Sequence, residues 1–229
     1  MFPTPLLAAG TPVALFCLVS FQAIAHPQLA QELAEMVRQD QAAIQKFIQS
    51  TDPQQRKAAT AAKEDLIERN TKRVQAIFDE HGFLGKAEVG DEGAGDFWLL
   101  VQHADHVPEF QRAVLERMKL AVEQQNADPQ HYAYLWDRVC KNAGKPQRFG
   151  TQVGYTSRGQ AVPLQLESPQ QVNARRSAIG LEPIEDYLND MTAGHFEMNR
   201  ALLEAQGVEG PAVYPEGYSR RDAFAAPAH

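Results

Sequence analysis

The sequence predicts a single, mainly helical domain with a small β-hairpin or irregular loop near residues 148–166. Three observations lead to this fold class. Apolar residues recur at helical spacing along most of the chain, and Pro and Gly stand where such stretches would begin and end. Residues 148–166 instead combine closely spaced glycines with β-favouring residues. We expect the domain to span residues 26–206.

The segment before the domain has the features of an export signal. Residues 1–25 carry no charged side chain and end in Ala23-Ile24-Ala25, the small-x-small pattern that signal peptidase accepts. We therefore expect a signal peptide at residues 1–25, cleaved after Ala25, and an exported (periplasmic or secreted) protein. An uncleaved membrane anchor is the alternative, although the apolar stretch is short for the ~20 residues that a span needs. A lipoprotein anchored at Cys17 is a weaker alternative, because the bulky Phe16 precedes that cysteine where a small residue is expected.

Charge and cysteine content restrict the partners and the source of stability. The net charge is −7 and stays −7 after cleavage, which argues against a nucleic-acid partner. After cleavage we also expect no contact with a membrane. Cys140 is then the sole cysteine, so an intramolecular disulfide cannot form and stability must come from packing. Cys140 lies at the edge of an apolar helix face next to Trp136, and we interpret it as a packing residue rather than a nucleophile.

The remaining elements follow from periodicity and from Pro and Gly positions. Helices are predicted at residues 27–47, 53–81, 108–125, 129–142, 169–180 and 183–205. Residues 89–96 hold three glycines and are predicted to form a loop. This loop lacks the Lys and Ser/Thr of a phosphate-binding loop, so we do not expect phosphate there. Residues 207–229 are rich in Pro, Gly and Ala and are predicted to be a loose tail.

Residues 97–106, "FWLLVQHADH", place polar side chains at the end of an apolar segment. A buried helix fits this pattern, and a short strand over residues 97–101 fits almost as well. Gln102, His103 and Asp105 are then either buried hydrogen-bonding residues or part of a catalytic or ligand-binding site. On a helix His103 and Asp105 point about 160° apart, so a carboxylate that orients His103 must come from elsewhere. His103 and His106 have no evident third ligand nearby, so we expect no metal site and no cofactor.

Two further segments carry charged residues near an apolar face. On a helix over residues 134–142, Asp137 and Arg138 fall opposite the apolar side, which predicts that solvent surrounds them. Arg175 and Arg176 flank the buried face of the helix at residues 169–180. Arginines in such places extend over the core, or they meet a buried carboxylate or an anionic ligand.

An ordered set of motifs resembles a bacterial family of domains of unknown function, number 6624. The motifs are "HGFLG…VG…GAGDFWLLVQHADHVPEFQ", "AYLWDRV…GKPQRFGTQ" and "VNARRSAIGLEPIEDYL", and the resemblance covers about residues 30–190. Phe83-Leu84 departs from the Trp-Pro that the family often has there. The resemblance implies that the polar stretches form one site and that Asp137 and Arg138 face inward. The family pattern falls on Gln102, His103, Asp105, Phe110, Gln111, Asp137, Arg138, Gln147, Gly150, Thr151, Gln152, Asn173 and Arg176. Among these we expect the site residues to be Gln102, His103, Asp105, Asp137, Arg138, Thr151, Gln152 and Arg176.

We therefore expect His103, Asp137, Arg138 and Gln152 to lie close together beside the core, with His103 or an arginine as the partner of Asp137. One hypothesis is a metal-independent hydrolase or lyase in which His103 is the general base and Asp137 orients it. The alternative is a non-catalytic binding module for a small anionic ligand, held by Arg138 and Arg176. A third interpretation is a structural polar network in a scaffold protein.

Overall fold

A computed structural model describes residues 24–217, and within this range the chain is mainly α-helical, which confirms the predicted fold class. The proposed signal peptide lies outside the described residues, except for Ile24 and Ala25, and so do residues 218–229. None of the described helices combines the length and the apolar character needed to cross a membrane. In chain order the elements are α1 (Pro27–Gln49), α2 (Pro53–His81), α3 (Lys86–Gln102), α4 (Pro108–Glu123), α5 (Pro129–Asn142), β1 (Val153–Tyr155), β2 (Ala161–Pro163), the 3₁₀ turn η1 (Pro169–Gln171), α6 (Val172–Ser177) and α7 (Ile184–Ala205).

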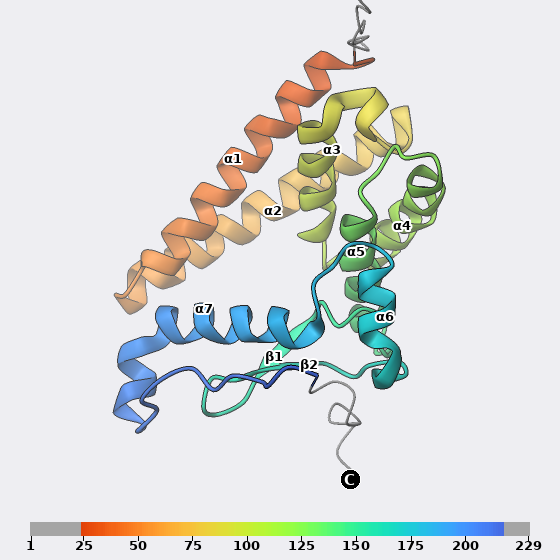
Figure 1. Cartoon of the computed structure of the whole chain (residues 1–229). Coiled ribbons are helices and arrows are strands. Elements are labelled where there is room, and N and C mark those ends of the chain that lie inside the picture. Colours follow the sequence, from red (N-terminus) through yellow and green to blue (C-terminus); the bar gives the residue numbers. More distant parts are fainter. Residues whose placement is uncertain (1–23, 218–229) are drawn as a thin grey trace, which may run out of the picture.

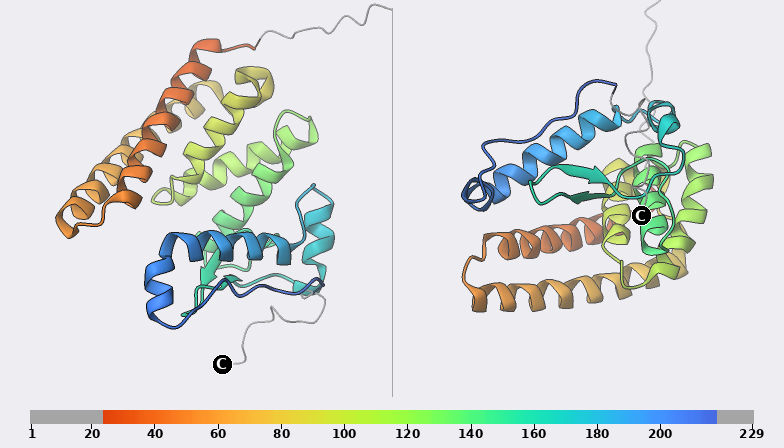
Figure 2. Two further views of the ribbon diagram at one scale, coloured as in Figure 1. Left: turned by 60° about the vertical axis from the view of Figure 1, so that its left-hand side comes forward. Right: turned by 90° about the horizontal axis from the view of Figure 1, so that it is seen from below.

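Helices α1 and α2 form a long antiparallel pair, and α3 packs against α1 (Figures 1 and 2). The start of α2 is fixed by Asp52, whose carboxylate accepts hydrogen bonds from the backbone N–H groups of Gln54 and Gln55. The helix ends at Gly82, which has a φ of 76° that favours glycine. The first and larger core lies between α1, α2, α3, α4 and α5. Its fully buried side chains include Leu33, Val74, Ile77, Phe97, Val101, Val114 and Leu135.

The predicted loop at residues 89–96 is wrong, because these residues belong to α3. The helix is kinked at Gly90, where φ is 79°. At Gly93 a Cβ atom would lie 3.3 Å from the Cβ of Ala30 on α1 and only 2.8 Å from that of Val89. Glycine at this position therefore allows α3 to approach α1 closely and does not break the helix. The helix continues to Gln102, so the strand alternative for residues 97–101 is also wrong.

The second part of the fold is built on a short hairpin. β1 and β2 pair antiparallel, with Val153 opposite Pro163 and Tyr155 opposite Ala161. α7 lies along β2, as the view from below shows (Figure 2). The helix predicted for residues 169–180 begins as the 3₁₀ turn η1 and ends at Ser177. A second core fills the space between the hairpin, α6 and α7 and contains Ala161, Leu166, Val172, Ile184, Tyr187, Leu188 and Tyr214.

The part of the predicted loose tail that the structure describes packs against this second core. Tyr214 is buried in this core, and Val208 is buried in a separate cluster with Phe196 and Leu203 of α7. The Tyr214 hydroxyl donates a hydrogen bond to the carbonyl oxygen of Ala161, and the Asn189 side-chain amide donates to the carbonyl oxygen of Tyr214. Residues 208–217 are therefore held in place, because aromatic burial and hydrogen bonds outweigh their loop-like composition.

A candidate ligand pocket beside His103

A pocket of about 410 Å³ lies where α3, α5, β1 and α7 meet. Five of the residues predicted for the site line it: Gln102, His103, Arg138, Thr151 and Gln152. The other lining residues are mostly aromatic or apolar: Trp98, Leu99, Tyr134, Val153, Tyr155, Tyr187 and Met191. The structure therefore brings three separate polar segments to one pocket. The remaining predicted residues, Asp105, Asp137 and Arg176, are not among its lining.

His103 is half-buried at the end of α3, and its ring faces a carboxylate from α1. The Nδ1 atom of His103 lies 2.9 Å from Oδ2 of Asp40, whose side chain is 2% exposed. The oxygen lies off the direction of an N–H bond on Nδ1, so the contact is a close approach of the two groups and not an aligned hydrogen bond. Asp40 was not among the predicted site residues. It follows Leu33 and Met36 at helical spacing, so a carboxylate on the apolar stripe of α1 is the sequence signal that could have identified it.

Asp137 does not orient His103, and this prediction is wrong. Asp137 is fully buried and accepts hydrogen bonds from the backbone N–H groups of Arg148, Phe149 and Thr151 and from the Thr151 hydroxyl. The predicted partners, His103 or an arginine side chain, do not take this role. Burial raises the pKa of Asp137, while these donors act in the opposite direction. The prediction from amphipathicity that solvent surrounds Asp137 is also wrong, because unpaired N–H groups of the following loop require a buried acceptor.

The loop that Asp137 holds forms one wall of the pocket. Gln147 is buried and reinforces the loop, since its side-chain amide donates to the carbonyl oxygens of Gln152 and Leu164 and accepts from the N–H of Gln152. The Tyr187 hydroxyl donates to the carbonyl oxygen of Thr151 at 2.8 Å. Thr151 and Gln152 are thus fixed through their backbone.

Arg138 lies on the same wall and is held from two sides. Its Nε donates to Oδ1 of Asp105 at 2.8 Å, and its Nη1 donates to Oε1 of Gln152 at 3.2 Å. Asp105 also accepts from the side-chain amides of Asn142 and Gln111. Burial alone would raise the pKa of Asp105, but the Asn142 hydrogen bond and the charge of Arg138 outweigh it, so the pKa lies below its usual value. Asp105 therefore acts as a positioning residue for Arg138.

Arg176 does not reach the pocket, although it was predicted as a ligand-binding residue. It is fully buried, and it donates from Nε to the carbonyl oxygen of Glu182 and from Nη1 to that of Phe149. Its guanidinium lies over the Tyr187 ring, 5.0 Å from the ring centroid. Arg175 likewise donates to carbonyl oxygens, those of Arg148, Glu167 and Ser168. Both arginines satisfy backbone carbonyls and support the fold.

The chemical groups at the pocket are an imidazole, a guanidinium, two side-chain amides, a hydroxyl and three phenols. A small anion can be recognised by such a set, and the imidazole can transfer a proton. Among residues 24–217 no group of three or more His, Cys, Asp or Glu side chains is arranged to hold a metal ion.

Comparison with known proteins gives one finding. The model of a protein family described as "Family of unknown function (DUF6624)" matches residues 27–195, which include all the residues of the pocket. No curated protein and no solved structure matches the chain.

Proposed function

We propose that this chain, which belongs to the DUF6624 family, is an exported bacterial protein whose pocket binds a small anionic molecule and acts on it by acid–base chemistry. The proposal includes cleavage of the signal peptide after Ala25. The observation that carries it is the half-buried imidazole of His103, which lines the pocket with the buried Asp40 carboxylate behind it.

The Asp40–His103 pair has the composition of a general base with its supporting carboxylate. Asp40 contacts Nδ1, so it favours the ring orientation that leaves Nε2 as the proton-transferring atom. A buried carboxylate next to the ring also stabilises the imidazolium that forms when Nε2 takes a proton from a substrate or water. The reaction class that fits is a metal-independent hydrolysis or elimination, with His103 as the catalytic base and Asp40 as the positioning residue.

Arg138 supplies the charge that would select an anionic substrate. Its Nε and Nη1 atoms are engaged by Asp105 and Gln152, and Nη2 has no hydrogen-bond partner among the described residues. A carboxylate or phosphate can take that free donor. A volume of 410 Å³ lies in the range of sites for small molecules.

A binding module without catalysis is the second candidate. Thr151 and Gln152 are fixed through the Asp137 and Gln147 hydrogen bonds, so the polar wall is already arranged before a ligand enters. Preorganised polar groups of this kind favour affinity as much as they favour catalysis.

The test uses the exported protein and a set of small carboxylates and phosphates, screened by the shift in melting temperature and then assayed for turnover. We expect Arg138→Gln to weaken binding at least about tenfold, the loss of one charge-assisted contact. His103→Gln should abolish turnover and change affinity little. Retained turnover in His103→Gln would exclude His103 as the catalytic base, and unchanged affinity in Arg138→Gln would exclude Arg138 as the anion-binding group.

His106→Gln is the matched control, because His106 is exposed three residues after His103 and does not line the pocket. If no anion stabilises the protein, and His103→Gln lowers only the melting temperature, the polar network is structural. Intact mass of the exported protein tests the cleavage after Ala25 independently of any ligand.

A further inference from the structure

Two histidines far apart in the sequence meet at one end of the α1–α2 pair. His26 directly precedes α1 and His81 is the last residue of α2. Their ring centroids are 5.0 Å apart and the rings are tilted by 52°. Both side chains are partly exposed, so an ion can reach them from solvent. Neither residue lines the pocket beside His103.

The cleavage proposed above changes the chemistry of His26. In the uncleaved chain its backbone nitrogen is an amide that donates to the carbonyl oxygen of Glu88 at 2.7 Å. After cleavage this nitrogen is a free amine on the same residue as an imidazole, and the two can chelate one ion. The next residue is Pro27, which has no backbone N–H that a metal could displace. The chelate of the new terminus is therefore restricted to the amine and the His26 ring.

We propose that the mature chain binds one Cu²⁺ ion through the His26 amine, the His26 imidazole and the His81 imidazole. The proposal rests on the cleavage after Ala25 and is independent of the chemistry at His103. Three nitrogen donors favour Cu²⁺ over the other divalent first-row ions, and Cu²⁺ accepts the tetragonal arrangement that a chelate and one further ring provide. The set includes a backbone nitrogen, so it differs from the side-chain metal clusters, of which residues 24–217 contain none.

The geometry and the charge around the two rings fit a cation. A metal-bound imidazole nitrogen lies about 2 Å from the ion, so two rings on one ion have centroids at most roughly 6.5 Å apart. The observed 5.0 Å is within that limit. His81 lies at the C-terminus of α2, the negative pole of the helix dipole, and its Nε2 is 3.6 Å from the Glu80 carboxylate.

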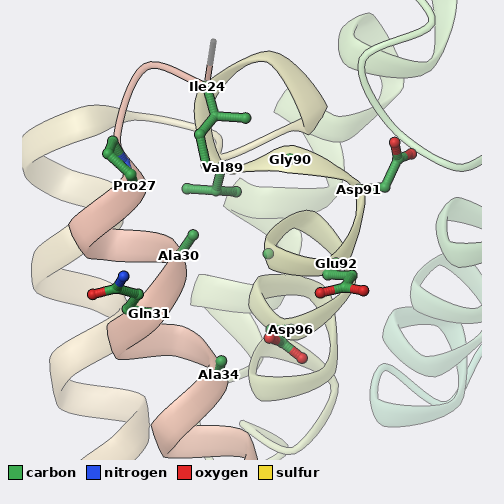
Figure 3. A pocket seen from close by; sticks show the side chains of 11 residues that line it. Ile24, Pro27, Ala30, Gln31, Ala34, Val89, Gly90, Asp91, Glu92 and Asp96 are labelled. Carbon is green, nitrogen blue, oxygen red and sulfur yellow. The ribbon is translucent and has the colours of Figure 1, made fainter. Parts of the chain in front are cut away.

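An acidic pocket adjoins the new terminus. Figure 3 shows this pocket of about 460 Å³, which is lined by Ile24 and Pro27, on either side of the proposed cleavage site, and by Asp91, Glu92 and Asp96 of α3. Burial raises the pKa of Asp96, and the neighbouring Glu92 carboxylate raises it further. Cleavage removes Ile24 from the pocket wall. Asp91 is paired with Lys86 at 2.8 Å, so Glu92 and Asp96 supply the uncompensated negative charge of this pocket.

The experiment titrates CuCl₂ into the exported protein whose N-terminus has been verified by intact mass. We expect one equivalent of copper to bind, an electron paramagnetic resonance spectrum with three nitrogen ligands, and a raised melting temperature. His81→Ala should lower the affinity at least about tenfold, the lower limit for loss of a supporting group at a metal site, and leave two nitrogen ligands. The uncleaved 229-residue chain, made by cell-free synthesis, keeps both rings but lacks the amine and should lose affinity to a similar degree.

His106→Ala is the control for an exposed histidine and should bind copper like the parent protein. Equal affinity and spectrum in the parent and His81→Ala would overturn the proposal, because the terminus alone would then account for binding. A mature N-terminus other than His26 would overturn it as well. Failure of the pocket hypothesis would appear separately, in the anion-binding and turnover assays of the His103 and Arg138 variants.

Discussion

Asp40 on α1 and His103 at the end of α3 form a carboxylate–imidazole pair in which the carboxylate is buried and the imidazole reaches the pocket. Replacing His103 and replacing Asp40 should have different effects on stability. Removal of the ring strands a buried charge, whereas removal of the carboxylate charge leaves a ring that can be neutral and is partly hydrated.

This asymmetry predicts the stability of three variants. His103→Ala should lower the free energy of unfolding by about 2–3 kcal/mol, because among residues 24–217 Asp40 then keeps only the exposed Gln41 amide as a partner. Asp40→Asn should cost about 1 kcal/mol. The double variant should be less destabilised than the sum of the two. Urea unfolding of the three variants gives the coupling energy, and additivity within about 0.5 kcal/mol would show that the contact carries no stability.

Asp137 holds the pocket loop, so its truncation should be far more costly than the loss of any one of its hydrogen bonds. Asp137→Ala leaves the buried N–H groups of Phe149 and Thr151 without an acceptor, and we expect a loss of about 3–5 kcal/mol. Thr151→Val removes one of the same hydrogen bonds and should cost about 1 kcal/mol. Chemical denaturation measures both changes. A small effect of Asp137→Ala would mean that water reaches this loop.

Gly150 and Gly144 provide a matched pair for the packing of that loop. Both have positive φ, 71° and 65°, so alanine should cost each about 1–2 kcal/mol of backbone strain. A Cβ atom at Gly150 would lie 2.4 Å from Cδ1 of the buried Ile184, whereas none of the described atoms lies within 4 Å of one at Gly144. Gly150→Ala should therefore be worse by a further 1–3 kcal/mol or so. Ile184→Val, which removes that Cδ1 atom, should recover part of the additional loss in thermal or urea unfolding; no recovery would assign the whole cost to the backbone.

The lowered pKa of His131 predicts that the free energy of unfolding decreases in mild acid. Its ring is stacked on Trp98 with centroids 3.9 Å apart, and burial lowers its pKa, with Asp128 opposing and Lys86 adding to the effect. The unfolded chain then binds more protons than the folded one below the usual pKa of 6.5. Stability falls as the pH drops from 6.5 to the lowered pKa and is constant, for this group, outside that window.

The measurement is the melting temperature at pH 7.5 and pH 5.5. His131→Phe keeps an aromatic ring beside Trp98 and should reduce the difference between the two values. His106→Phe, at an exposed position, should leave the difference unchanged. An equal acid loss in His131→Phe would assign the effect to other groups.

The helices could be predicted because their signals are local. Asp52-Pro53 begins α2 and Gly82 ends it by capping and by positive φ, which depend on a few neighbouring residues. Local preference predicts a loop for the glycines of residues 89–96, whereas Gly93 lies within α3 at a close contact with Ala30 on another helix, which local preference does not report. The glycine-containing part of α3 can thus be assigned to a helix only when its packing against α1 is known.

The sequence identified several residues of the candidate site, but it did not identify which side chains contact one another. The motif resemblance identified His103, Arg138 and Gln152, which share the pocket. The partner of His103 is Asp40, which precedes the quoted motifs in the sequence. Asp137 accepts hydrogen bonds from backbone N–H groups of a loop, and the sequence does not show that these groups lack other acceptors. Side-chain pairing depends on the tertiary distance between helices, which periodicity does not contain.

The position of Tyr214 has a consequence for the order of folding. The first core is complete at α5, so its helices can pack while the rest of the chain is still being synthesised. The second core includes Tyr214, whose hydroxyl reaches back to Ala161 on β2. The hairpin wall beside the pocket therefore needs Tyr214 to be in place, and the pocket should form after the first core.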